Sequence, residues 1–129
     1  MTERSELIEL HNRLSKTLDE ERVAAKDKRH DKGYRTAREN LDDLIDRDSF
    51  VEYGQLAVAA QKSRREIEEL RTETAADGII TGFGKINGDI LQDSKALSAI
   101  IINDYSVLAG TQGYYHHKKL DRICAVSYT

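Results

Sequence analysis

The sequence predicts an α/β fold in which a small sheet is accompanied by helices. Two apolar, β-branched runs, 79–86 and 99–108, are the only strand candidates of any length. A long charged helix is expected before them, and a C-terminal helix is expected to begin near Thr111. The chain of 129 residues has the length of one domain, which we divide into a charged N-terminal helix over 1–35 and an α/β unit over 36–129.

Composition limits the classes of function. Hydrophobic residues make up 39% of the chain and charged residues 33%, so the core is thin and much of the surface is solvated helix or lies on a partner. A net charge of −3 argues against a nucleic-acid binder, which needs a concentrated basic surface. A single cysteine excludes an internal disulfide, and no segment has the apolar length of a signal peptide core or a membrane span. A cytoplasmic protein without a membrane partner is expected.

The first segment, 2–32, is predicted to be one continuous helix. Its apolar residues form a narrow stripe at helical spacing: Leu7, Leu10, Leu14 and Leu18. The charged run 19–32 is typical of a solvated face, and the alternative is a helix that packs on another subunit. Because isolated helices gain little from propensity alone, the stripe is expected to dock on a partner chain or to stay mobile.

The second helix has a clear start signal. Gly33 is expected to end the first helix, and Thr36 with Glu39 three residues later forms a capping box. This helix is predicted to stop near Asp48 and to be followed by a short strand over 50–53. Segment 61–73 is consistent with either a helix or a mobile charged loop.

The first long strand has an almost bare face. Gly82 and Gly84 alternate with larger residues, which indicates that another backbone, a helix or a ligand approaches closely there. Asn87 and Gly88 are expected to supply the positive φ angles of a tight turn. The following run, 99–108, is predicted to be a strand buried on both faces.

Four segments together carry a family resemblance. They are TAREN (36–40), Asp-x-x-Ser-Phe-Val-Glu (46–52), ADGIITGFGKING (76–88) and DYSVLAGTQG (104–113). In order and spacing they resemble the N-terminal portion of the carboxyltransferase (beta) subunit of biotin-dependent acyl-CoA carboxylases, the acetyl-CoA or propionyl-CoA type. The resemblance covers residues 24–122.

The resemblance implies a crotonase/ClpP-like fold of strand-strand-helix units, here truncated, and transfer of a carboxyl group from carboxybiotin to an acyl-CoA. The implied partners are acyl-CoA, the biotin carboxyl carrier and biotin carboxylase subunits, and further copies in a homo-oligomer. Biotin is carried by a partner protein, and this chain is expected to bind no cofactor itself. Two other functions stay open: a non-catalytic fragment that binds or assembles with carboxylase subunits, and a piece of a related biotin-dependent acyl-CoA decarboxylase.

The sequence departs from the family pattern in two places. Asn40 stands where the family commonly has an arginine, which puts in doubt any phosphate or subunit contact made by that arginine. The glycine pairs that stabilise the oxyanion in the family lie beyond Thr129, so no catalytic residue is assigned, and the chain alone is expected to be inactive.

The resemblance also suggests a candidate acyl-CoA site: Gly110, Thr111, Gln112 and Gly113. A helix beginning at Thr111, capped by its hydroxyl, would point free amides and the positive end of its dipole at a CoA phosphate or pantetheine amide. The competing interpretation is that these glycines merely permit a tight turn.

Other chemical motifs are weak. Gly82-Phe83-Gly84 lies within a strand and is not a dinucleotide loop. Adjacent His116 and His117 diverge on a helix and are interpreted as a surface pair, so no metal site is assigned. Cys124 is interpreted as a small buried side chain. Asp104 is expected at a strand end, accepting hydrogen bonds from a neighbouring turn.

Overall fold

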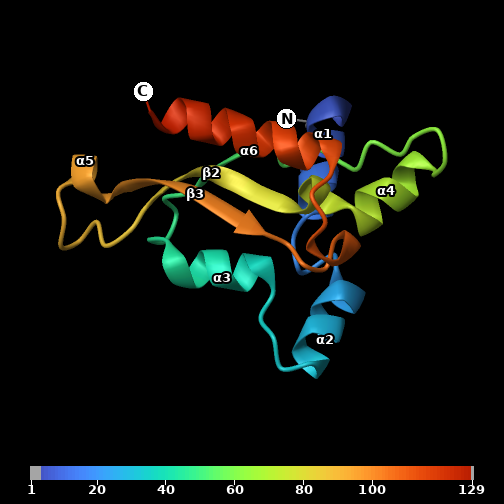
Figure 1. Cartoon of the computed structure of the whole chain (residues 1–129), viewed down its shortest axis with the longest axis horizontal. Helices are drawn as coiled ribbons and strands as arrows, with labels where there is room; N and C mark the ends of the chain where they lie inside the picture. Colours follow the sequence, from blue (N-terminus) through green and yellow to red (C-terminus); the bar gives the residue numbers. More distant parts are fainter. Residues whose placement is uncertain (1–3, 129) are drawn as a thin grey trace.

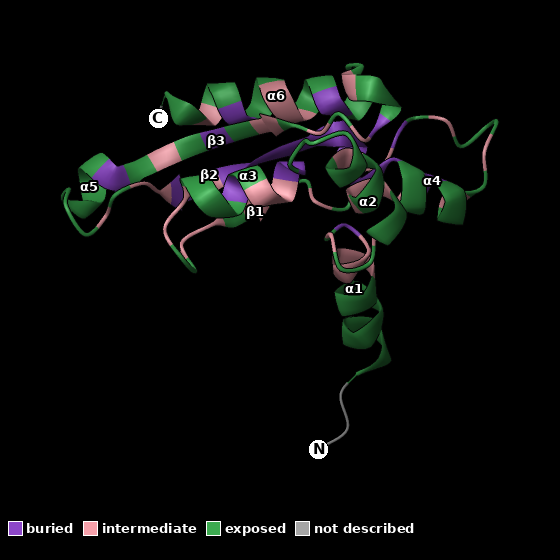
Figure 2. Cartoon of the chain, turned by 90° about the horizontal axis from the view of Figure 1, so that it is seen from below, coloured by how far each residue is buried: buried purple, intermediate pink, exposed green. Residues whose placement is uncertain are grey.

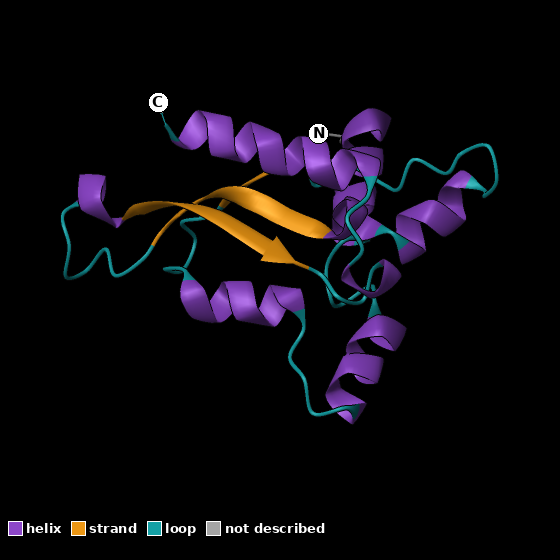
Figure 3. Cartoon of the chain, in the orientation of Figure 1, coloured by secondary structure: helices purple, strands orange, loops and turns teal. Residues whose placement is uncertain are grey.

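The computed structural model describes residues 4–128, and it is organised around a three-stranded antiparallel sheet (Figure 1). The order of the strands in the sheet is β1-β2-β3. Helix α6 covers one face of the sheet and α3 covers the other, and α1, α2 and α4 gather at one end (Figure 3). The elements in chain order are α1 (Ser5–Ser15), α2 (Val23–Asp31), α3 (Ala37–Leu44), β1 (Val51–Tyr53), α4 (Ile67–Glu73), η1 (Ala75–Gly78), β2 (Ile79–Lys85), α5 (Asp93–Ala96), β3 (Leu97–Asn103), η2 (Leu108–Gly110) and α6 (Tyr114–Ser127).

The central strand β2 pairs with both neighbours. Ile79 lies opposite Asn103 and Lys85 opposite Leu97 in β3, while the short β1 pairs with Thr81 to Phe83. One side of the sheet packs on α3 in a core cluster of Ala37, Leu41, Ile80 and Ile100. The predicted α/β unit with a short strand over 50–53 is confirmed.

The bare face of β2 is in close contact with the preceding segment, as predicted. A Cβ added at Gly82 would lie 2.1 Å from the backbone oxygen of Val51, and one added at Gly84 would lie 3.2 Å from the Ile45 side chain. Only a residue without a side chain allows β1 and the end of α3 to approach so closely.

The predicted tight turn after β2 is wrong. Asn87 has a positive φ of 57°, but Gly88 does not, and eleven residues with the short α5 among them separate Lys85 from β3. The Asp46 carboxylate accepts hydrogen bonds from the amides of Asn87 at 3.1 Å and Gly88 at 2.7 Å. A side chain 41 residues away therefore fixes a loop that local turn chemistry alone would have closed earlier.

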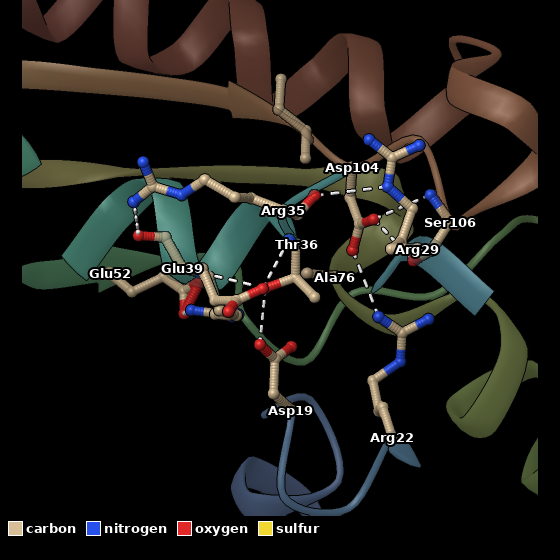
Figure 4. A network of polar contacts seen from close by, with 12 residues as sticks. Asp19, Arg22, Arg29, Arg35, Thr36, Glu39, Glu52, Ala76, Asp104 and Ser106 are labelled. Atoms are coloured by element: carbon tan, nitrogen blue, oxygen red, sulfur yellow. Dashed lines mark hydrogen bonds and ion pairs between the residues drawn. The ribbon is translucent and has the colours of Figure 1, made fainter. Parts of the chain in front are cut away.

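The continuous helix over 2–32 is also wrong. Residues 1–3 lie outside the described part, and the remainder divides into α1 and α2 at a turn over 16–22. Thr17 donates to the Leu14 carbonyl at 2.7 Å, and the Asp19 carboxylate accepts from the Thr36 hydroxyl at 2.6 Å. Arg22, with non-helical backbone angles, reaches Asp104 (Figure 4). These contacts satisfy polar groups that a straight helix would leave without partners.

Two predictions about the apolar runs differ in outcome. The apolar stripe is about half exposed, with Leu14 partly buried: Leu7 and Leu10 on α1 are 42% and 41% exposed, Leu18 in the following turn is 37% exposed, and α1 extends away from the sheet (Figure 2). The second strand, in contrast, is shorter than predicted and is not buried on both faces. Ile100 is buried against α3, but Leu97 and Ile101 point to the opposite face of the sheet, where every second residue of β3 is exposed.

The capping box that starts α3 is confirmed. The Thr36 hydroxyl accepts from the Glu39 amide at 3.0 Å, and the Glu39 carboxylate accepts from the Thr36 amide at 2.8 Å.

Segment 61–73 resolves into a coil followed by α4. None of the helices within residues 4–128 is long and apolar enough to cross a bilayer. The division of the chain at residue 35 stays a prediction.

Candidate functional site

A groove lies between α2 and the turn that follows β3. Its volume is about 600 Å³. It is lined by Glu21, Arg22, Val23, Ala24, Ala25, Lys28, Arg29, Lys32, Thr72, Glu73, Tyr105, Ser106, Leu108 and Ala109. Four of these side chains are basic and two are acidic, so the lining is net positive in a chain whose net charge is −3. The groove is suited to a negatively charged ligand that also presents apolar surface.

An ion pair holds the two walls of the groove together. An Arg22 nitrogen donates to the Asp104 carboxylate at 3.2 Å, and the two side chains are 7% and 16% exposed. The other carboxylate oxygen of Asp104 accepts from the Ser106 amide at 2.9 Å and hydroxyl at 2.6 Å (Figure 4). Asp104 therefore has the predicted structural role at the end of a strand, and it ties α2 to the turn.

Arg29 lies between two aromatic rings at the same place. Its guanidinium carbon is 4.7 Å from the centroid of Tyr34 and 5.2 Å from that of Tyr105, and its Nε donates to the Arg35 carbonyl at 3.3 Å. Cation–π contacts fix the position of this charge without neutralising it. Lys28 on the same helix and Lys32, the residue that ends it, are exposed and add two mobile charges.

The predicted site residues Gly110, Thr111, Gln112 and Gly113 follow this groove directly in the chain. The expected start of the helix is wrong: α6 begins at Tyr114, and Thr111 is extended with no capping hydrogen bond. Positive φ angles at Ala109 and Gly110 turn the chain before the helix can form. Ligand binding by the four residues stays a prediction.

A buried carboxylate already occupies the N-terminus of α6. Asp77 is 1% exposed, and its Oδ2 accepts from the His116 amide at 2.8 Å. A Cβ added at Gly113, the N-cap residue, would lie 3.0 Å from Oδ1 of Asp77, so glycine here makes room for that carboxylate. One of the amide donors in the first turn of the observed α6 is thus taken by the protein.

His116 and Lys119 complete this buried cluster. His116 Nδ1 lies 3.1 Å from the Asp77 carbonyl, which can only accept, so Nδ1 carries the proton. Lys119 donates to the Ala76 carbonyl at 2.8 Å and also to the Ile79 carbonyl, and burial lowers its pKa to about 8. The interpretation of the two histidines as a surface pair is therefore wrong for His116, because α6 turns that side chain onto η1.

The other chemically reactive candidate lies on the surface. Cys124 is exposed, which contradicts its interpretation as a buried side chain, since Ile123 takes the inward position on α6. Among residues 4–128, no group of three or more His, Cys, Asp or Glu side chains could hold a metal ion.

Sequence reasoning missed the residues that form the groove. Arg22, Lys28, Arg29 and Lys32 belong to a run interpreted as a solvated face, and Tyr105 was assigned to a strand. The clustering of basic residues between 22 and 35 was the available signal. The spacing of these basic residues could not show that the turn after β3, about 80 residues later in the chain, lies opposite them.

Comparison with known proteins adds the decisive observation. Residues 28–129 match the family model described as the carboxyl transferase domain. The chain belongs to this family. The match starts within α2 and includes β2, β3 and the turn at 110–113, so most of the groove lies inside the carboxyl transferase domain. The resemblance expected from the four motifs is confirmed.

Relatives agree with this assignment. The biotin-dependent acetyl-/propionyl-coenzyme A carboxylase beta5 subunit of Mycobacterium leprae is 34% identical over 122 residues, covering 95% of this chain and 20% of that subunit. The methylmalonyl-CoA decarboxylase subunit alpha of Veillonella parvula is 32% identical over 118 residues, covering 88% of this chain and 20% of its own length. This carboxyl transferase chain thus spans about a fifth of the length of the curated relatives it matches.

Solved structures confirm the fold. A single-chain, multi-domain long-chain acyl-CoA carboxylase superposes with a TM-score of 0.95 at 48% identity, covering 98% of this chain and 13% of that one. The transcarboxylase 12S hexamer, solved with methylmalonyl-coenzyme A bound, gives a TM-score of 0.70 at 24% identity, covering 98% and 23%, and supports the fold alone. The crotonase-like class predicted for this carboxyl transferase chain is confirmed.

Proposed function

We propose that this chain forms part of the acyl-CoA-binding side of a carboxyltransferase, with the groove beside α2 as the place where the CoA phosphates bind. In the complete enzyme, a carboxyl group would pass from carboxybiotin to an acetyl- or propionyl-CoA acceptor. Biotin would arrive on a partner subunit, as the family implies, and enter as a substrate.

The single observation that carries the proposal is the charge of the groove. Arg22, Lys28, Arg29 and Lys32 face a turn that leads into the four predicted site residues, 110–113. Arginine and lysine are the side chains that bind phosphates, by fork-shaped hydrogen bonds and by point charge respectively. Val23, Ala24 and Leu108 give apolar surface for the less polar parts of a CoA.

Titration of CoA, followed by backbone amide shifts, tests this proposal. We expect shifts on α2, at 105–109 and at 110–113, with a dissociation constant near millimolar, which corresponds to about 4 kcal/mol. Pantetheine, which lacks the phosphates, should move 110–113 at most and leave α2 unchanged. Absence of shifts in all three segments at millimolar CoA would contradict the proposal.

A double variant, Lys28→Ala with Lys32→Ala, removes the two mobile charges without touching the Arg22–Asp104 pair. CoA binding should weaken about tenfold, the loss expected for one charge-assisted contact. Arg47→Ala is the matched control, since its side chain is 96% exposed and lies outside the groove lining. Equal CoA affinity in the double variant and the wild type would exclude α2 as the phosphate site.

A second function is favoured by a different feature. The uncovered stripe on α1 suits a non-catalytic piece that assembles with carboxylase subunits. A pull-down with biotin carboxylase and carrier subunits distinguishes the two: an assembly fragment binds them in the absence of CoA, and that binding is lost when Leu7 and Leu10 are changed to serine.

A further inference from the structure

A second cleft lies apart from the groove, between the C-terminal end of α1, the coil after β1 and α4. Its volume is about 190 Å³. It is lined by Arg13, Thr17, Gln55, Leu56, Ala57, Val58, Lys62, Ile67, Arg71, Ala75 and Ala76. None of these residues lines the groove beside α2, so the cleft is independent of the function proposed above.

The charged side chains of this cleft are all positive. Arg13, Lys62 and Arg71 line it, and no aspartate or glutamate does. Each arginine has a carboxylate partner that is not part of the lining: Arg13 pairs with Glu9 and Arg71 with Glu68. These partners hold the guanidinium groups in position and leave the interior of the cleft without a negative group.

One donor at the cleft has no acceptor. The Nε atom of Arg13 is buried, and within residues 4–128 no hydrogen-bond partner is found for it. The nearby Gln55 side-chain nitrogen donates to the Thr17 hydroxyl at 2.7 Å, and that hydroxyl donates to the Leu14 carbonyl, so these groups bond to one another and not to Arg13. Buried donors are normally satisfied, and an exception indicates a bound water, ion or ligand.

From this lining we infer that the cleft binds a small oxyanion, a phosphate or carboxylate group, between Arg13, Lys62 and Arg71. Its volume holds a group of that size and excludes a whole nucleotide or acyl-CoA. The planar guanidinium fork matches the two oxygens of either anion, and the Lys62 ammonium adds a further donor to the lining. The site is distinct from the CoA groove and belongs to no step of carboxyl transfer.

The test uses inorganic phosphate and acetate on the whole chain, at constant ionic strength set with chloride. We expect saturable amide shifts at 55–58 and at 75–76, with α2 unchanged. Saturation by phosphate alone assigns a phosphate site, and saturation by acetate as well assigns a general oxyanion site. Shifts that do not saturate with either anion would overturn the inference.

Substitutions distinguish a built site from surface attraction. Arg13→Met and Lys62→Ala should each raise the midpoint of the anion titration about tenfold. Arg13→Lys should restore little of the lost affinity, because lysine has no guanidinium fork. Both positions lie on the surface, on α1 and a loop, so the variants are expected to fold. Arg47→Met, with the same loss of charge elsewhere, should not change the midpoint. An unchanged midpoint in Arg13→Met would refute the site, whatever the CoA titration shows.

Discussion

The Asp77 carboxylate caps α6 from outside that helix: Oδ2 accepts from the His116 amide at 2.8 Å, across 39 residues of sequence. Asp77 has a left-handed backbone (φ 48°), as does Ala76 before it (φ 55°). Such angles are costly for residues with side chains, and the surrounding contacts must hold them. The cap thus joins the strained turn before β2 to the helix that covers the sheet.

Replacing Asp77 with alanine should lower the free energy of unfolding by about 2 kcal/mol, the upper range for loss of an N-cap, because the His116 amide would be buried without an acceptor. Asp77→Asn keeps an oxygen acceptor and tolerates the left-handed angle, so we expect it to recover most of this loss. Urea unfolding of both variants measures the difference. Equal loss in the two variants would show that the buried charge, and not the hydrogen bond, is what stabilises the helix.

Gly82→Ala should destabilise the chain by about 3 kcal/mol or more, because its Cβ would lie 2.1 Å from the Val51 oxygen and force β1 away from β2. Gly33→Ala is the control. That glycine has a φ of +78° and nothing within 4 Å of an added Cβ, so its cost of about 1 kcal/mol is conformational only. Chemical denaturation compares the two. A smaller decrease in the free energy of unfolding for Gly82→Ala than for Gly33→Ala would mean that β1 can shift away from β2 at little cost.

Acid should weaken the start of α3. The Thr36 amide and then His30 lower the pKa of Glu39 from 4.5 to about 2. Because the folded-state pKa is depressed, the stabilisation is present above the unfolded pKa of 4.5 and is lost as the pH falls toward 2. Stability of the wild type should therefore decline more steeply between these limits than that of Glu39→Gln. Parallel pH profiles for the two proteins would contradict this assignment.

Helix α1 should exchange its amide hydrogens quickly in the isolated chain. No residue of Ser5–Ser15 is buried, and the apolar stripe lacks cover. Addition of carboxylase subunits should slow exchange over 7–18 if the stripe docks on them. Uniformly slow exchange in a proven monomer would show that α1 is stable without a partner.

The purified 129-residue chain should show only background transfer from carboxybiotin to acetyl- or propionyl-CoA. The resemblance implies that the oxyanion-stabilising glycine pairs of the complete enzyme lie outside the fifth of its length that this chain spans, and loss of even one such donor costs about a hundredfold or more in rate. The assay needs a preparation freed of host carboxylase. Turnover that co-purifies with the chain through that step would show that other groups in it stabilise the oxyanion.

Local chemistry determined what the sequence alone could establish. The Thr36–Glu39 capping box depends on residues three apart, and the close approach at Gly82 and Gly84 follows from alternation along one strand. The four motifs, likewise, are contiguous segments whose order and spacing are visible without a structure. These features led to the α/β class and to the carboxyl transferase family.

Tertiary structure decided the features that depend on contacts between distant segments. Arg22 reaches Asp104 across 82 residues and so breaks the predicted continuous helix, and Asp77 reaches α6 and binds the His116 amide in its first turn. The exposure of Leu97 depends on what covers its face of β3, which the composition of the strand cannot reveal. In each case the outcome depends on whether a segment far along the chain supplies a partner, and periodicity within a segment carries no information about that partner.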